Sequence, residues 1–366
     1  MTAVHGGDLQ AVAERYGVDA STLVDFSANI APQGPPSGVA RVLARAASKP
    51  RLLAPYPSSR YGRLRAQIAA SLDVDRESVV VGNGSAALID LALRASEALA
   101  WLVPVPAFSE YRRSLDAANV AMLRFALPQT LALDVDAFLS VLRAHRDAGA
   151  LVTTPHNPSG LALSREESLR LLAQSEAMNR PLIADEAFID YVPTRSIVRE
   201  AARSRRAVVL RSLTKFYALA GVRVGYAIAH PDLARAMRER SPSWPVGTLD
   251  EAIALEALED EAYAMRTRAA NAATRDAVTR ELTTLGLAVY PSDANFVLAE
   301  LPVPAQAFDA FLRSLIDEGI VVRDCRSYDG LESRSLIRIA VLDRERNRRL
   351  VAALARALES RHARRD

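Results

Sequence analysis

Lysine is almost absent from this chain, so the position of each lysine is informative. Of the 46 lysines and arginines in 366 residues, only Lys49 and Lys215 are lysines. A guanidinium stays protonated in proteins, so arginine cannot replace lysine where a free amine must act as a nucleophile. Lys49 lies beside a proline in a predicted loop and is interpreted as a surface residue. Lys215 is preceded by two short hydroxyl residues, Ser212 and Thr214, and is followed eight positions later by Arg223.

These side chains fit a cofactor that carries both an aldehyde and a phosphate. The amine of Lys215 would form a Schiff base with the carbonyl. The hydroxyls of Ser212 and Thr214 and the guanidinium of Arg223 would hold the phosphate. The sequence therefore predicts pyridoxal 5′-phosphate (PLP) as the cofactor.

A second phosphate-binding pattern lies in residues 79–87, predicted to be a strand followed by the start of a helix. Gly84, Ser85 and Ala86 would expose backbone N–H groups at the helix N-terminus, where phosphate binds well. The same residues fit Gly-x-Gly-x-x-Ala, the dinucleotide-binding fingerprint. That fold needs an acidic residue about 20 positions further on, and residues 101–106 contain none. A dinucleotide site is therefore disfavoured, and the segment is interpreted as a phosphate site for another cofactor.

Three further residues are candidates for the ring of the cofactor. Asp185 is predicted to end a buried strand, at the edge where open α/β sheets bind ligands. It would either cap a helix or keep a pyridinium nitrogen protonated, as the electron-sink chemistry of PLP requires. Asn157 lies in a loop that is either a plain turn or the donor of an amide N–H to the phenolate oxygen. Phe108 would either stack on the ring or fill the core.

The elements that must position these residues form a regular pattern. Short apolar runs alternate with helical periodicity through the first two thirds of the chain. The predicted strands are 78–81, 101–103, 150–153, 182–184, 207–211 and 224–229, and predicted helices between them are 85–95, 110–118 and 164–179. This alternation predicts an α/β fold with a largely parallel sheet that is covered on both faces.

The pattern changes after the proline-rich segment 241–245. The predicted elements beyond it are a long helical stretch (249–285), a strand (294–298), a helix (305–318), two strands (320–323 and 336–341) and a final helix (344–358). We therefore divide the chain into an N-terminal arm (1–35) that packs on the small domain and the active site, a large PLP-binding domain (36–245) and a smaller α+β domain (246–366).

Composition limits the classes of function. The net charge is only +3, and basic and acidic residues are interleaved, so no nucleic-acid surface is predicted. The five histidines show no ligand spacing, so no metal site is expected. No apolar run reaches the ~20 residues that span a bilayer, and the N-terminus lacks a signal-peptide pattern. With Cys325 as its single cysteine, the chain is expected to be cytoplasmic.

Together, the motifs resemble those of the fold-type I PLP-dependent enzymes of the aminotransferase class I/II superfamily. The resemblance rests on Asn157-Pro158-x-Gly160, Asp185-Glu186-Ala187-Phe188, Ser212-x-x-Lys215 and Arg223, and it covers nearly the whole chain. It implies a large domain with a mostly parallel seven-stranded sheet and a smaller α+β domain. It also implies that Lys215 carries the cofactor and moves the proton, that Asp185 pairs with the ring nitrogen, and that Asn157 contacts the ring hydroxyl.

The resemblance implies two further roles. Arg338, in Leu336-Ile-Arg338-Ile, would bind the carboxylate of the substrate. Tyr56, in Pro55-Tyr56-Pro57, would reach the cofactor phosphate of a neighbouring subunit. A homodimer with shared active sites would follow.

The N-terminus is similar to that of one group within the superfamily, the L-threonine-O-3-phosphate decarboxylases of cobalamin biosynthesis. The matching segments are His5-Gly6-Gly7-Asp8 and residues 25–35. The similarity implies a small phosphorylated amino acid as substrate, with its phosphate bound by His5, Asn29 and Arg323 and with Asn157 and Arg338 also in contact with it. The chain departs from this group's pattern at Ala31, His156 and residues 243–247.

Two alternatives remain open at the level of sequence. The related histidinol-phosphate aminotransferases usually have tyrosine where this chain has Phe188, and amino transfer to or from a phosphorylated amino acid is the first alternative. A non-catalytic binding protein on the same fold is the second. That alternative requires a lost lysine or an added DNA-binding module, and neither is found in this sequence.

Overall fold

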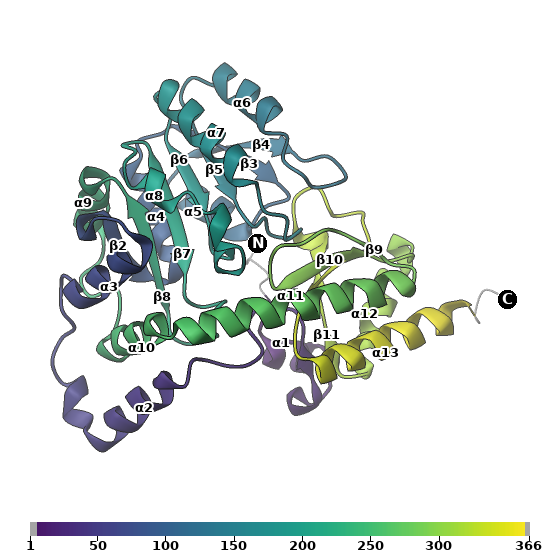
Figure 1. Ribbon diagram of the computed structural model, residues 1–366. Coiled ribbons are helices and arrows are strands. Elements are labelled where there is room, and N and C mark those ends of the chain that lie inside the picture. The colour runs from purple at the N-terminus through teal and green to yellow at the C-terminus, as the bar shows by residue number, and fades with distance from the viewer. Residues whose placement is uncertain (1–5, 363–366) are drawn as a thin grey trace.

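The computed structural model describes residues 6–362 and shows two parts that are joined by a long helix (Figure 1). The larger part contains a seven-stranded sheet with the order β2-β8-β7-β6-β5-β3-β4. Its strands are β2 (Val79–Asn83), β3 (Ala100–Val105), β4 (Ala121–Ala126), β5 (Ala148–Thr153), β6 (Leu182–Asp185), β7 (Ala207–Ser212) and β8 (Val224–Ala229). All neighbours are parallel except β8, which is antiparallel to β2 and β7. The predicted α/β fold is confirmed.

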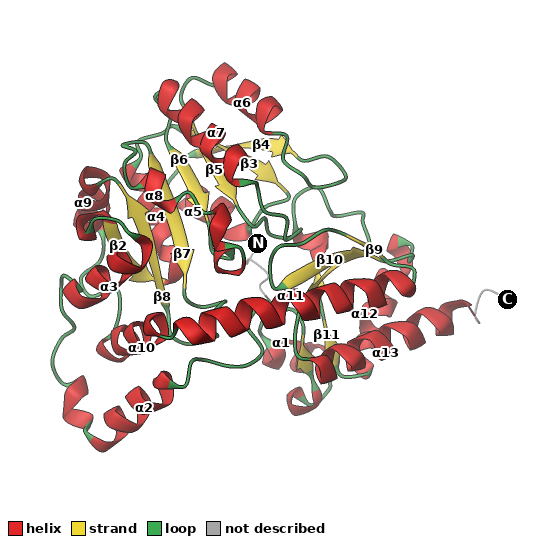
Figure 2. Cartoon of the chain, viewed as in Figure 1, coloured by secondary structure: helices red, strands yellow, loops and turns green. Residues whose placement is uncertain are grey.

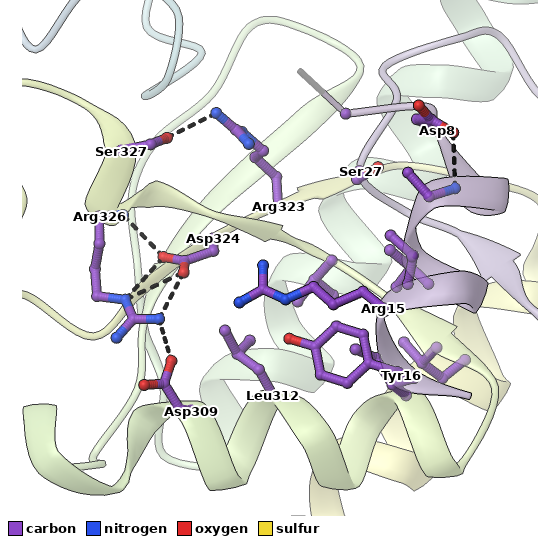
Figure 3. A pocket seen from close by; sticks show the side chains of 17 residues that line it. Asp8, Arg15, Tyr16, Ser27, Asp309, Leu312, Arg323, Asp324, Arg326 and Ser327 are labelled. Atoms are coloured by element: carbon purple, nitrogen blue, oxygen red, sulfur yellow. Dashed lines mark hydrogen bonds and ion pairs between the residues drawn. The ribbon is translucent and has the colours of Figure 1, made fainter. Parts of the chain in front are cut away.

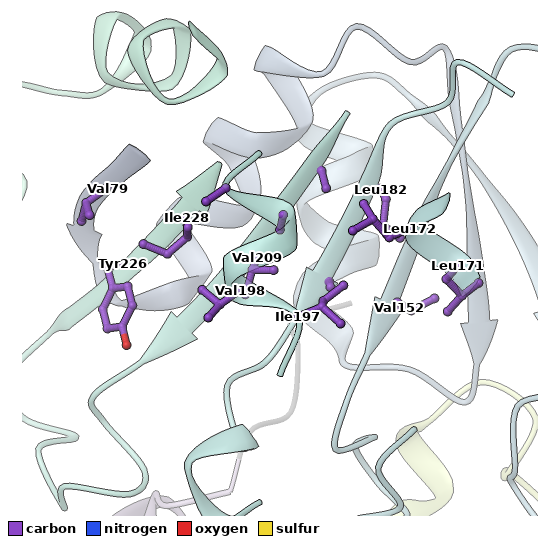
Figure 4. Close-up of a cluster of buried hydrophobic side chains, with 14 of the residues drawn as sticks. Val79, Val152, Leu171, Leu172, Leu182, Ile197, Val198, Val209, Tyr226 and Ile228 are labelled. Carbon is purple, nitrogen blue, oxygen red and sulfur yellow. The ribbon is translucent and has the colours of Figure 1, made fainter. Parts of the chain in front are cut away.

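Helices cover both faces of this sheet. They are α2 (Gly38–Ser48), α3 (Gly62–Leu72), α4 (Gly84–Ala95), α5 (Ser109–Ala117), α6 (Val135–Ala144), α7 (Arg165–Ala177), α8 (Val198–Ala201), α9 (Pro231–Arg240) and α10 (Thr248–Glu259). One apolar cluster, which includes Val209, Ile228 and Leu182, lies on one face (Figure 4). Another cluster, which includes Val208 and Leu210, lies on the opposite face. Because consecutive residues of β7 point to opposite buried faces, its first four residues (207–210) are all apolar.

Strand β4 is the strand of the seven-stranded sheet that the sequence pattern missed; the two-residue strands β1 (Val24–Asp25) and β9 (Ala288–Val289) were not predicted either. Strand β4 lies at the edge of the sheet beside β3, and each of its residues is either exposed or only partly buried. It also carries Arg124 in its centre. An edge strand of this kind has no continuous apolar run, so periodicity does not separate it from a loop.

The smaller part contains an antiparallel four-stranded sheet with the order β12-β13-β10-β9. Its elements are α11 (Glu261–Thr284), β9 (Ala288–Val289), β10 (Phe296–Glu300), α12 (Phe308–Asp317), β11 (Ile320–Val321), β12 (Arg323–Asp324), β13 (Leu336–Ala340) and α13 (Arg344–His362). The N-terminal arm adds α1 (Leu9–Tyr16) and β1 (Val24–Asp25). Strand β1 pairs in parallel with β11, and Phe26 is buried in the apolar cluster of the small sheet. The described part of the arm therefore packs on the smaller part.

The long helical stretch predicted over 249–285 is two helices rather than one (Figure 2). The break falls at Asp260, whose side chain accepts a hydrogen bond from the backbone N–H of Tyr263 at 2.7 Å and so caps α11. Helix α10 packs against α2 and α3, and Gln67 donates to the carbonyl of Leu255. Residues 248–259 thus share the core of the larger part, whereas the sequence pattern places the boundary at 246. Within residues 6–362, no helix is long and apolar enough to cross a bilayer.

Candidate active site

The candidate cofactor residues meet at the carboxyl edge of the parallel strands. Thr153 at the end of β5 is in register with Asp185 at the end of β6. Ser212 ends β7 and is in register with Gly225 of β8, which also pairs with Gly82 of β2. Residues that are more than a hundred positions apart in sequence are therefore brought to one edge, as ligand sites of open α/β sheets require.

The turn between β2 and α4 brings a helix N-terminus onto this edge. Gly84 has a positive φ of 70°, and its N–H donates to the carbonyl of Arg223 at 3.0 Å. A Cβ atom at Gly84 would lie 2.8 Å from Nη2 of Arg223, so a larger residue would enter the space beside the guanidinium. A Cβ atom at Gly225 would lie 2.7 Å from the backbone nitrogen of Ser85. Because neither glycine has a side chain, the backbone N–H groups at the start of α4 and the guanidinium of Arg223 can lie close together and form a cup. Such a cup suits a phosphate.

Two hydroxyl groups stand at the end of β7, beside this cup. The Oγ of Ser212 and the Oγ1 of Thr214 are 2.7 Å apart, and the N–H of Thr214 donates to Ser212 Oγ at 3.3 Å. Both residues are buried. The structure therefore places the predicted hydroxyl residues beside the start of α4.

The amine of Lys215 is chemically primed by its surroundings. Burial, together with the positive charges of Arg223 and Arg338, lowers its pKa to about 8, and the charge of Asp185 opposes this shift. An ordinary lysine has a pKa near ~10.4 and is almost fully protonated at neutral pH. A substantial fraction of Lys215 is therefore the free amine that a nucleophile requires.

Asp185 is held by a partner that the sequence does not reveal directly. Its side chain is buried and accepts a hydrogen bond from the hydroxyl of Tyr111 at 2.7 Å and from the N–H of Ala187 at 3.0 Å. Burial raises the pKa of Asp185, while the Tyr111 hydroxyl, the Ala187 N–H and Lys215 oppose that rise. The Tyr111 hydroxyl also lies 2.7 Å from Thr153 Oγ1. Asp185 is thus fixed as an acceptor at the centre of the site.

Tyr111 and Phe108 form one structural unit. Phe108 is the N-cap residue of α5, and its ring meets the ring of Tyr111 edge-to-face at 5.7 Å. Residues three positions apart share one side of a helix start. The spacing from Phe108 places Tyr111 on this side of the helix, but it does not mark Tyr111 as the partner of Asp185. Phe108 is only partly buried and packs against the edge of an apolar core cluster, so its stacking on the cofactor ring stays a prediction.

Asn157 is oriented by an arginine from the other sheet. Its Oδ1 accepts a hydrogen bond from Nη1 of Arg338 at 2.6 Å and from the hydroxyl of Tyr328 at 3.2 Å. A guanidinium has no acceptor atom, so the amide oxygen of Asn157 must face it. The amide N–H₂ is directed away from Arg338 and is the end that would donate to a ring oxygen.

Arg338 lies in β13 and is 6 % exposed. Its guanidinium also donates to the backbone carbonyl of Ser27 at 2.9 Å and lies 5.3 Å from the ring centre of Phe296. In the antiparallel register of β12 and β13, Arg338 is paired with Arg323. The small sheet therefore presents two buried guanidinium groups from neighbouring strands.

The N-terminal arm closes onto these groups. Besides the bond from Arg338 to Ser27, the N–H of Ala31 donates to the carbonyl of Lys215 at 3.1 Å. Asn29 lies between these two anchors and is 5 % exposed, and its Oδ1 has no hydrogen-bond partner among the described residues. A buried amide oxygen of this kind is a position for a ligand or a water. His5, predicted to act with it, lies outside the described residues.

Arg323 borders a cavity of about 440 Å³ between α1 and α12 (Figure 3). It is 8 % exposed and donates to Ser327 Oγ at 2.7 Å. Ser27 also lines this cavity. The neighbouring guanidinium of Arg326 is paired with Asp324 at 2.7 Å, so its charge is already balanced within the wall.

His156 is neutral and structural. Burial lowers its pKa to about 4, although a hydrogen bond to the carbonyl of Pro106 opposes that shift. Its Nε2 lies 2.9 Å from this carbonyl, which only accepts, so Nε2 carries the proton. Its Nδ1 then accepts from Ser159 Oγ at 2.8 Å. His156 thus joins the Asn157 loop to the segment before Phe108.

Tyr56 is not brought together with the other candidates within the chain. Its side chain is 79 % exposed and stacks on Trp244 with ring centres 4.4 Å apart. Phe188, by contrast, is buried against Phe296 at 5.0 Å. The structure of one chain therefore leaves Tyr56 on the surface, where a second chain would have access to it.

The sequence model of the aminotransferase class I and II family matches residues 21–354. The chain belongs to this family. It is 32 % identical to the threonine-phosphate decarboxylase of Salmonella typhimurium over 363 residues, which is 97 % of each chain. It is also 32 % identical to the histidinol-phosphate aminotransferase of Oleidesulfovibrio alaskensis, covering 95 % of this chain and 90 % of the relative.

A solved structure of this class I and II family has the same fold. The histidinol-phosphate aminotransferase of Clostridium acetobutylicum aligns with a TM-score of 0.82 and 27 % identity, covering 91 % of this chain and 98 % of that one. The fold is therefore that of the fold-type I PLP-dependent enzymes, as predicted.

PLP is the cofactor of this chain, which belongs to the aminotransferase class I and II family. The candidate site residues fit this cofactor. Lys215 offers an amine with a lowered pKa, and Asp185 a buried acceptor. A Cβ atom at Gly84 would fill the space beside Arg223 in which a phosphate would bind. In residues 6–362, no group of three or more His, Cys, Asp or Glu side chains is arranged to hold a metal ion.

Proposed function

We propose that this protein is a PLP-dependent decarboxylase that converts L-threonine O-3-phosphate into (R)-1-amino-2-propanol O-phosphate in cobalamin biosynthesis. The observation that carries the proposal is the pair of buried arginines, Arg338 and Arg323, in register on neighbouring strands. A guanidinium can pair with a carboxylate or a phosphate through two parallel hydrogen bonds. A substrate that carries both a carboxylate and a phosphate supplies one anion for each guanidinium.

Each residue would have a defined task in this reaction. Bound PLP supplies an aldehyde for attachment of the substrate amine and a ring that accepts electrons from the α-carbon. Asp185, as a carboxylate, would hold a proton on the ring nitrogen. Arg338 would bind the substrate carboxylate, and Asn157 the ring hydroxyl.

The proton balance is completed by Lys215. When the bond between the α-carbon and the carboxylate breaks, CO₂ leaves and the α-carbon must gain a proton. An amine with a pKa near 8 exchanges protons readily near neutral pH. Lys215 Nζ would therefore deliver that proton.

The substrate phosphate would be bound by Arg323, with Asn29 and His5 of the N-terminal arm. Asn29 is 5 % exposed, and its amide N–H₂ is the end that would donate to a phosphate oxygen, because Oδ1 only accepts. The arm is anchored to Arg338 through Ser27 and to Lys215 through Ala31. Closure of the arm over the substrate would exclude water from both anionic groups.

A second candidate function is amino transfer, for example to or from histidinol phosphate. It is favoured by the identity of 32 % to a histidinol-phosphate aminotransferase, equal to that of the decarboxylase. Both reactions would use Lys215, Asp185 and Asn157 in the same way. They differ in which bond at the α-carbon breaks.

We also infer that the protein acts as a cytoplasmic homodimer. Tyr56 and Trp244 are exposed aromatic residues that stack on one another, and Leu52 and Leu53 are exposed nearby in sequence. Exposed apolar residues that gather in one place are typical of subunit interfaces. Tyr56 would then contact the cofactor phosphate of the partner subunit.

The deciding experiment measures CO₂ release from O-phospho-L-threonine and from L-threonine. We expect CO₂ from the phosphorylated substrate and far less from threonine, because an empty cationic site would remain. Arg323→Ala should raise KM for O-phospho-L-threonine by at least about tenfold, with PLP binding retained. Arg338→Ala should impair both amino acids, since both carry a carboxylate. Amino transfer between histidinol phosphate and 2-oxoglutarate, without CO₂ from phosphothreonine, would replace this proposal with the second candidate.

A further inference from the structure

Tyr328 contacts both arginines of the small sheet. We propose that Tyr328 is the positioning residue that sets Arg338 and Arg323 relative to one another, and so selects ligands with a carboxylate and a phosphate a short distance apart. The inference rests on the proposed function for the roles of the two arginines. The inference goes beyond the proposed function because it names the side chain that couples the two arginines.

The hydroxyl of Tyr328 holds the first arginine. Nη1 of Arg338 donates to the Tyr328 oxygen at 2.9 Å, and the Tyr328 hydroxyl donates to Asn157 Oδ1 at 3.2 Å. The same Nη1 group donates to Asn157 Oδ1 at 2.6 Å. These three bonds close a triangle, so the hydroxyl fixes where the guanidinium of Arg338 lies. A phenylalanine at this position would leave two sides of the triangle open.

The ring of Tyr328 holds the second arginine. The guanidinium carbon of Arg323 lies 5.5 Å from the ring centre, within the range of a cation–π contact. The residue before Tyr328 adds a polar contact, because Nη2 of Arg323 donates to Ser327 Oγ at 2.7 Å. Two consecutive residues thus hold Arg323 from its face and from its edge.

The segment that carries Tyr328 is itself rigid. Tyr328 is 6 % exposed and packs in an apolar cluster with Leu131, Leu298 and Leu336. Its N–H donates to the carbonyl of Cys325 at 3.0 Å, and its own carbonyl accepts from the N–H of Leu331 at 3.1 Å. A ring with these fixed contacts transmits its position to both guanidinium groups. The two cations therefore form one preorganised unit rather than two independent sites.

The consequence is selectivity for a paired anion. Arginines held at a constant spacing bind a ligand that bridges them without losing further side-chain freedom. A ligand with only one anionic group meets one of them and leaves the other unpaired. Removal of the Tyr328 hydroxyl should lower the affinity of Arg338 for the carboxylate. Removal of the ring should in addition lower the affinity of Arg323 for the phosphate.

The test uses 3-phosphoglycerate, which has a carboxylate and a phosphate on a three-carbon chain and no amine to react with PLP. Glycerate is the matched ligand without the phosphate. Both are titrated calorimetrically into the PLP-loaded protein, the Tyr328→Phe variant and the Tyr328→Leu variant. We expect Tyr328→Phe to weaken both ligands by about tenfold. Tyr328→Leu should weaken 3-phosphoglycerate by about a further fivefold, so that the preference over glycerate narrows.

Tyr290→Phe is the control variant. Tyr290 also accepts a hydrogen bond from an arginine, Arg334, and the Arg334 guanidinium lies 5.8 Å from the centre of the Tyr290 ring. Neither residue belongs to the proposed substrate site. This variant should bind both ligands as the unchanged protein does. If Tyr328→Leu fails to fold, Tyr328→Phe alone tests the hydroxyl, and unchanged affinity for both ligands overturns the inference.

The outcomes separate this inference from the proposed function. Wild-type protein that prefers 3-phosphoglycerate to glycerate but releases no CO₂ from phosphothreonine retains the paired-anion site and loses the decarboxylase assignment. Wild-type protein without that preference overturns the inference. A preference that is retained in full by Tyr328→Leu overturns the role of Tyr328 alone, with the decarboxylase assignment intact.

Discussion

At the scale of single residues, the reactivity of Lys215 comes first from its burial, which lowers its pKa, and then from the charges around it. Arg223 approaches from the cofactor phosphate cup, Arg338 from the small sheet and Asp185 from the neighbouring strand. The first two disfavour the ammonium form and the third favours it. The balance leaves the amine with a pKa of about 8.

The cofactor-free protein should therefore react with PLP half-maximally near pH 8. At pH 7.5 its free-amine fraction should exceed that of an ordinary lysine by roughly two hundredfold. Asp185→Asn should move this midpoint to lower pH, because it removes the charge that favours the ammonium. Arg338→Ala should move it to higher pH. The measurement is the rate of PLP attachment against pH, and a midpoint near that of free lysine contradicts the expectation.

At the scale of elements, the β2–α4 turn places a helix N-terminus against the end of β7. The turn depends on Gly84, whose positive φ suits glycine and whose missing side chain leaves space beside Arg223. Gly225, in β8, likewise has no side chain that would keep the start of α4 away from the sheet. The phosphate cup is thus a property of how two elements meet rather than of any one side chain.

Gly84→Ala should weaken PLP binding by tenfold or more and destabilise the protein by about 1–2 kcal/mol. The methyl group would meet Arg223 Nη2 at 2.8 Å. Gly286→Ala is the matched control: its φ is 83°, but a Cβ there would meet no atom of the described residues within 4 Å. The control should lose similar stability and keep its PLP affinity, measured by fluorescence titration. Equal losses of affinity in both variants would attribute the effect to backbone strain.

At the scale of the whole molecule, the candidate active site is built from three separate regions of the chain. The larger part contributes Lys215 and Asp185, the small sheet contributes Arg338, and the arm contributes Asn29. Tyr56 is exposed on the surface of the single chain. A site completed by a second copy would explain why a polar aromatic residue stacks on Trp244 at the surface.

Mixed dimers test this assembly. Lys215→Arg and Tyr56→Ala variants should each have low activity, the first because it lacks the amine. If Tyr56 acts on the partner's site, one site in each mixed dimer combines an intact Lys215 with an intact Tyr56. Unfolding and refolding the two variants together should then restore roughly a quarter of wild-type activity. No restoration, with dimers present by analytical ultracentrifugation, would show that Tyr56 does not act across the interface.

The sequence by itself determined the cofactor and the general fold of this protein. A lysine in a chain of arginines, an aspartate after an apolar run and a glycine-rich strand end are local signals, because residue type and short spacing are sufficient to recognise them. The alternation of apolar runs and helical periodicity likewise predicted the buried strands β5 to β8. In such strands every residue is buried on one face or the other, so the pattern is continuous.

Only the tertiary structure decided how the substrate side of the site is arranged. Tyr111 reaches Asp185 across 74 positions and Tyr328 reaches Asn157 across 171, and no local pattern records such pairs. The pairing of Arg338 with Arg323 depends on the register of two short strands. Contacts of this kind arise from packing between distant segments, whereas sequence periodicity reports only which face of one element is buried.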